Sequence, residues 1–177
     1  MKKTKKRNGS SVLIDDLTRI HNKRYLKEKQ KDIEEFRVRN IPYSVMIVDI
    51  DQLKRINDTY GRAKGDKVLV EFSQFLKSSL RSTDIVVRYG GDEFVCVMPN
   101  SKRFDAEHVY KRIVRQCKGK KFGELDITIS AGVASHPDDA EDFNKLLKIA
   151  VEALYDAKRR GRSGVGGIRK KSIESKK

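Results

Sequence analysis

Two acidic side chains, Asp92 and Glu93, follow a pair of glycines in the stretch from Arg88 to Phe94. Apolar, mostly β-branched residues precede this stretch at 85–87 and follow it at 94–98. The pattern predicts a β-hairpin, because glycine adopts the backbone angles of a tight turn without steric cost. The glycines also leave space in front of both acids, where a phosphate and a cation could approach. An ordinary hairpin with a solvated acidic tip would give the same local pattern.

A second group of acids ends another strand-like run, Tyr43 to Asp49, and continues to Asp51. If this run and the hairpin belong to one sheet, the two groups of acids can meet. Hard divalent cations take oxygen ligands and bridge phosphates, so paired acid clusters favour a nucleotidyl-transfer site. The simpler alternative for Asp49 is an N-cap role, because a predicted helix follows it.

The elements that must position these acids follow from hydrophobic periodicity and from the places of glycine and proline. Helices are predicted over 22–38, 51–61, 67–80, 104–117 and 143–160, and strands over 43–49, 85–87, 94–98 and 125–134. Asn22 is the expected N-cap of the first helix, Pro42 follows its end, and Gly161 to Gly167 is expected to be a glycine-rich exit. This order predicts an α/β fold with a mixed, largely antiparallel central sheet flanked by helices, and with the hairpin at the active site.

The net charge of +15 suggests polyanionic partners, and much of it lies in the two ends of the chain. One domain is expected over 12–168, between basic disordered tails at 1–11 and 169–177. A nucleic-acid-binding role is disfavoured, because the tails have no interleaved aromatic residues. There is no apolar run of membrane-spanning length, and Cys96 and Cys117 have no metal-type spacing, so a cytoplasmic location is expected.

The sequence around the acids resembles the GGDEF family of diguanylate cyclases, whose members condense two GTP molecules into cyclic di-GMP. The matching blocks are 15–18 with 22–24 (DxLT…NRR), 49–58 (DIDxFKxIND), 90–94 (GGDEF), 130–133 (SxGV) and 153–162 (ALYxAKxxGR). The resemblance covers about residues 13 to 168 and implies a fold like the palm of nucleotide polymerases and nucleotidyl cyclases.

The resemblance implies a Mg²⁺ (or Mn²⁺) site formed by Asp49, the carbonyl of Ile50, and Asp92. Asp92 also matches the proton acceptor of the family, and Glu93 matches a ligand or a supporting residue; the sequence leaves these two roles open. Lys54 matches a lysine that stabilises negative charge on the phosphate being transferred. The alternative for Lys54 is an ordinary solvated lysine on a helix.

Substrate binding is implied for Leu53, Asn57, Arg62, Asp66, Lys158 and Arg162. Asn57 and Asp66 match the pair that reads guanine. An aspartate accepts from guanine N1–H and from its 2-amino group, which adenine does not offer, so GTP is the expected substrate. Lys158 and Arg162 match a phosphate-binding pair. Cations that complement the dipole of the last helix are the alternative for this pair.

Arg81 and Asp84 stand upstream of the hairpin at the spacing of the family's RxxD inhibitory site, which binds cyclic di-GMP. Arg112 falls where some members have a secondary arginine of that site. A non-catalytic cyclic di-GMP receptor is the alternative function, but the intact 90–94 string favours an enzyme. Each site holds one GTP, so turnover is expected to need a homodimer. Either a missing or separate regulatory domain arranges this dimer, or the catalytic domain itself, a partner or product bound at Arg81 does so.

Several positions depart from the family pattern. Arg19 stands where the family's LTGL signature has glycine, and His21 stands where it has proline. Arg62 replaces a histidine near the nucleotide, and Leu53 replaces a common phenylalanine. None of these departures removes an expected metal ligand or phosphate-binding cation, so activity is expected.

Overall fold

The computed structural model describes residues 12–161 and 165–167. Its elements are β1 (His21–Asn22), α1 (Lys23–Glu28), α2 (Gln30–Val38), β2 (Tyr43–Ile50), α3 (Leu53–Tyr60), α4 (Arg62–Ser78), β3 (Ile85–Arg88), β4 (Glu93–Pro99), α5 (Arg103–Cys117), β5 (Ile129–His136), α6 (Phe143–Arg159) and β6 (Val165–Gly167). The expected basic tails, 1–11 and 169–177, and the expected domain end at 168 lie outside the described residues.

The strands form one six-stranded sheet in the order β1-β3-β4-β2-β5-β6. The pairs β3–β4, β4–β2 and β2–β5 are antiparallel, whereas β1–β3 and β5–β6 are parallel. Every residue of β2 and of β5 is buried, as expected for central strands that are covered on both faces. The predicted α/β fold with a mixed, largely antiparallel sheet is therefore confirmed.

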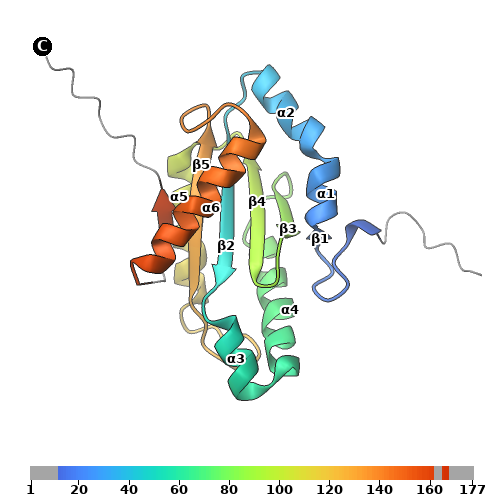
Figure 1. Ribbon diagram of the computed structural model, residues 1–177, viewed down its shortest axis with the longest axis vertical. Helices are drawn as coiled ribbons and strands as arrows, with labels where there is room; N and C mark the ends of the chain where they lie inside the picture. The colour runs from blue at the N-terminus through green and yellow to red at the C-terminus, as the bar shows by residue number, and fades with distance from the viewer. Residues whose placement is uncertain (1–11, 162–164, 168–177) are drawn as a thin grey trace, which may run out of the picture.

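Helices cover both faces of the sheet (Figure 1). Along β2, Val45 and Ile47 pack on the face covered by α1, α2 and α6, while Met46 and Val48 pack on the face covered by α3, α4 and α5. Successive side chains of a strand point to opposite faces, so Asp49 continues the Val45–Ile47 row toward α6. Among the described residues, no helix has the length and apolar character needed to cross a bilayer.

The predicted first helix is two helices, which are separated by the single turn residue Lys29. Neither glycine nor proline marks this break in the sequence. The predicted N-cap is confirmed, because the Asn22 side chain accepts hydrogen bonds from the backbone N–H groups of Arg24 and Tyr25.

Two other predicted boundaries were wrong. α4 begins at Arg62 and not at 67, because Gly61 (φ 84°) reverses the chain directly after α3. β5 spans 129–136 and not 125–134, because Phe122 and Leu125 close a tight turn in which Gly123 and Glu124 have positive φ. Part of the predicted glycine-rich exit forms β6, which pairs with β5.

Candidate active site

The acids of the two clusters meet at one end of the sheet. In the β2–β4 register, Asp49 lies directly opposite Glu93, and the Ile50 N–H donates to the Asp92 carbonyl at 3.3 Å. The turn is closed by the N–H of Tyr89, which donates to the Glu93 carbonyl at 2.8 Å. The predicted hairpin is present, but the expected tight glycine turn was wrong: residues 89–92 join β3 to β4, and neither Gly90 nor Gly91 has a positive φ. The cross-strand neighbour of Asp49 is Glu93, one residue beyond Asp92.

Asp49 is 2% exposed and lies against α6. Its Oδ2 is 2.6 Å from Nζ of Lys158, and its Oδ1 is buried without a hydrogen-bond partner among the described residues. Burial, together with the negative charges of Asp92 and Glu93, raises the pKa of Asp49 to about 6, although Lys158 opposes this rise. The N-cap alternative for Asp49 was wrong: the N-cap residue of α3 is Gln52, and it makes no side-chain cap bond.

Oδ1 of Asp49 is buried and accepts no hydrogen bond, so it is suited to bind a cation. In the part of the chain that the structure describes, no group of three or more His, Cys, Asp or Glu side chains is arranged to hold a metal. Mg²⁺ usually keeps waters and substrate phosphates among its ligands and needs only one or two protein carboxylates. Asp49, Asp92 and the Ile50 carbonyl are sufficient on that basis.

Arg88 anchors the hairpin to the N-terminal part of the chain. Its guanidinium donates to the Gly91 carbonyl at 2.8 and 3.2 Å and to Oδ1 of Asp15 at 3.0 Å. Burial raises the pKa of Asp15, but hydrogen bonds from Thr18 and Arg88 outweigh this effect and lower it. Sequence reasoning assigned Arg88 no role; its place directly before the turn was the available signal.

The residues expected to read guanine lie where α3 meets α4. Asn57 is on α3, and its Oδ1 is buried without a partner, whereas Asp66 is half-buried on α4. A Cβ built on the intervening Gly65 would stand 1.8 Å from this Asn57 oxygen. Gly65 is therefore the residue that makes room for the Asn57 side chain.

The remaining expected site residues are less closely grouped. Lys54 and Arg62 are exposed at the starts of α3 and α4, where a ligand can reach them. Leu53 is 5% exposed and packs in the core beneath α3. Lys158 is beside Asp49, and Arg162 lies outside the described residues.

Replacement of Gly65 by alanine is expected to weaken GTP binding by about tenfold or more, because the new methyl group displaces the Asn57 amide. Alanine has a higher helix propensity than glycine, so the helix propensity of this position in α4 should not lower the free energy of unfolding. Isothermal titration with a non-hydrolysable GTP analogue measures the effect. Asn57→Ala should reproduce it, and the double variant should bind no worse than either single variant. Additive losses would show that Gly65 acts independently of Asn57.

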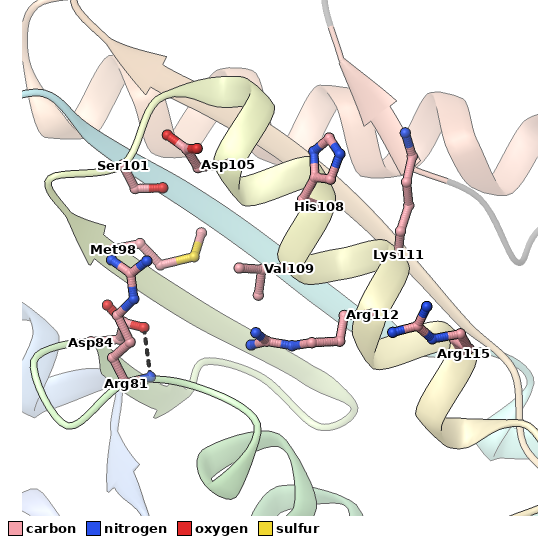
Figure 2. Close-up of a pocket in the computed structure, with 10 residues that line it drawn as sticks. All are labelled: Arg81, Asp84, Met98, Ser101, Asp105, His108, Val109, Lys111, Arg112 and Arg115. Atoms are coloured by element: carbon pink, nitrogen blue, oxygen red, sulfur yellow. Dashed lines mark hydrogen bonds between the residues drawn. The ribbon is translucent and has the colours of Figure 1, made fainter.

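A separate cavity of about 570 Å³ lies between the loop before β3 and helix α5 (Figure 2). The Arg81 N–H donates to Oδ2 of Asp84 at 2.9 Å, and Arg112 reaches from α5 to donate to the Ser79 carbonyl at 2.5 Å. The structure thus brings the three expected inhibitory-site residues to one cavity. Sequence reasoning did not identify the other α5 residues that line it, among them His108, Lys111 and Arg115.

The fold and this site define an α/β domain with an acid-bearing hairpin beside a lysine-bearing helix. The chain belongs to the GGDEF family: the family model described as "Diguanylate cyclase, GGDEF domain" matches residues 12–164. Response regulator PleD of Caulobacter vibrioides is 38% identical over 163 residues, which cover 88% of this chain and 36% of PleD. Diguanylate cyclase DosC of Escherichia coli is also 38% identical over 163 residues, with 87% of this chain and 35% of DosC covered.

Solved structures agree with this family assignment. The active GGEEF domain of a diguanylate cyclase from Vibrio cholerae superposes with a TM-score of 0.77 and 30% identity, covering 85% of this chain and 98% of that domain. The chain spans about a third of the length of the two curated relatives, 36% of PleD and 35% of DosC.

Proposed function

We propose that this domain is a Mg²⁺- or Mn²⁺-dependent diguanylate cyclase that condenses two GTP molecules into cyclic di-GMP and two pyrophosphates. The observation that carries the proposal is the buried Asp49 carboxylate, with one unpartnered oxygen, beside the hairpin acids Asp92 and Glu93. In each of the two condensations, a 3′-oxygen bonds to an α-phosphorus, the bond to pyrophosphate breaks, and the hydroxyl proton is released. The family assignment supports this chemistry.

The proposed roles of the protein groups follow their positions. When bound, the metal polarises the α-phosphate and lowers the pKa of the 3′-hydroxyl. Asp92 accepts the hydroxyl proton, and Glu93 supports it from the neighbouring position. Lys54 and Lys158 offset charge on the phosphates. The Lys158 ammonium already lies 2.6 Å from Asp49, so phosphate oxygens that enter the site meet a cation in place.

The same reaction implies the partners of the domain. Each domain presents one GTP, whose guanine is held by Asn57 and Asp66, so two copies must face each other for turnover. The longer relatives PleD and DosC leave room for a further domain that would arrange this dimer.

Incubation of the protein with GTP and Mg²⁺, followed by chromatography of the products, tests the proposal. Cyclic di-GMP should form, and Asp92→Ala should reduce its rate by about a hundredfold to ten-thousandfold. Asp138→Ala, at an exposed acid in the turn after β5, is the matched control and should leave the rate unchanged. Binding of cyclic di-GMP without any GTP conversion would instead identify a receptor.

Product inhibition through Arg81, Asp84 and Arg112 is the finer part of the proposal, supported by the shared cavity. The unpartnered Oδ1 of Asp84 is a free acceptor, and the arginines are suited to guanine and phosphate. Arg81→Ala should keep the initial rate and raise the inhibition constant for cyclic di-GMP by about tenfold or more. An inhibition constant that does not change would remove this part of the proposal and leave the cyclase assignment standing.

A further inference from the structure

A second cavity has a volume of about 310 Å³. It shares Asp84 with the 570 Å³ cavity that Arg81 and Arg112 line, but its other lining residues are different. We call it the N-terminal cavity. One wall is formed by Arg19, from the turn before β1, and by His21, the first residue of β1. Another wall is formed by Lys77 near the end of α4. Ser82 and Thr83, from the loop that leads into β3, complete its polar lining.

Positive charge exceeds negative charge in the lining of the N-terminal cavity, where Arg19 and Lys77 face a single acid, Asp84. Neither Arg19 nor Lys77 forms an ion pair within residues 12–161. The pKa of His21 is lowered, first by burial and second by the charge of Lys77, although the backbone of Leu13 offsets part of this. Asp84 is the acid in the lining, and its Oδ2 already accepts from the Arg81 N–H.

Hydrogen-bonding groups in the cavity are also unused. Nδ1 of His21 is buried and has no partner, and the ring is fixed by stacking on Tyr25, with centroids 3.5 Å apart and planes 7° from parallel. The hydroxyl groups of Ser82 and Thr83 are exposed and make no hydrogen bond to the described residues. Two cations and two hydroxyls match the needs of a tetrahedral oxyanion.

Arg19 and His21, which both line this cavity, are departures from the family pattern. Arg19 has a φ of 61°, a left-handed conformation that glycine adopts freely and arginine does not. Its N–H donates to the Asp15 carbonyl at 2.9 Å and maintains the turn in spite of this. Arg19, with its unfavourable φ, and His21, two residues later, both line one positively charged cavity. Binding of an anionic ligand would explain why these two residues are present.

We propose that the N-terminal cavity binds a phosphate-class anion, with Arg19 and Lys77 as counter-charges and with Ser82 and Thr83 as hydrogen-bond donors. The volume suits orthophosphate, pyrophosphate or one phosphate group of a larger ligand. A bound anion connects the N-terminal turn, whose Asp15 holds Arg88, to the segment that carries Asp84. This site is independent of the proposed cyclase activity.

Titration of the whole chain with orthophosphate, pyrophosphate and cyclic di-GMP, in separate experiments at constant ionic strength, tests the proposal. The readouts are the NMR shifts of the His21 ring and the dissociation constant from calorimetry. Either Arg19→Gly or Lys77→Met should weaken binding of the simple anions by about tenfold or more, because each removes a charge-assisted contact. Arg19→Gly also relieves the positive φ, so this variant should fold at least as well as the parent.

Two control variants separate the possible sources of binding. Lys148→Met removes an exposed positive charge from α6, away from the cavity, and should bind orthophosphate and pyrophosphate like the parent. The His21 ring shift caused by orthophosphate should be the same in Arg81→Ala as in the parent, because Arg81 does not line the N-terminal cavity. The proposal is overturned if orthophosphate and pyrophosphate do not bind, or if Lys148→Met weakens their binding as much as Lys77→Met does. It is also overturned if only cyclic di-GMP shifts the His21 ring signals and Arg81→Ala abolishes that shift.

Discussion

The Asp49→Asn variant is expected to make cyclic di-GMP about a thousandfold more slowly than the parent protein. The amide carries no charge and offers one oxygen, so the site loses both its metal affinity and the carboxylate that Lys158 contacts. Initial rates measured across a Mg²⁺ titration show the effect. The exposed control Asp138→Asn should keep the parental rate and metal dependence. A rate for Asp49→Asn within a few fold of the parental rate would exclude Asp49 as a metal ligand.

The same variant also measures how much the buried charge of Asp49 costs in folding stability, separately from its catalytic role. The folded-state pKa of Asp49, about 6, lies above its ordinary value of 3.8, so protonation favours the folded state. This contribution is fully present below the ordinary pKa and is lost as pH rises through about 6. In EDTA, the free energy of unfolding of the parent should therefore fall by about 3 kcal/mol relative to Asp49→Asn between acidic and neutral pH. Parallel pH profiles for the two proteins would contradict this account.

Alanine at Gly132 is expected to destabilise the fold by about 3 kcal/mol or more. Gly132 lies on β5 beneath α6, and a Cβ at this position would stand 2.0 Å from the Ala150 carbonyl oxygen and 2.4 Å from the Leu154 nitrogen. Both atoms are backbone, so helix and strand must move apart. Urea unfolding measures the loss as a lower midpoint with an unchanged slope.

Because α6 also carries Lys158, the shift forced by Gly132→Ala should lower cyclase activity even where the protein is still folded. Gly91→Ala is the matched control for stability, because a Cβ there meets no atom within 4 Å and the backbone φ is not positive. If Gly132→Ala unfolds at the parental midpoint, α6 does not pack as closely on β5 as the structure shows.

Local pattern was sufficient for the hairpin and for most of the elements. The glycine pair with flanking β-branched residues predicted β3 and β4, and the apolar run before Asp49 predicted β2, because period and turn preference are properties of the nearest neighbours in the chain. Local pattern was insufficient at Lys29, where α1 and α2 separate without a breaking residue. It was also insufficient at 125–128, where apolar and polar residues alternate as in a strand, but β5 begins only at Ile129.

The sequence by itself determined the chemistry of the site: which acids, which lysine and which glycines are present, and that the acids end strands. Only the tertiary structure decided that Glu93 stands opposite Asp49, that Lys158 holds one Asp49 oxygen while the other has no partner, and that Arg19 and His21 share a cavity with Lys77. The physical reason is that strand register and helix docking are set by packing between distant segments. Composition and spacing along the chain do not contain those contacts.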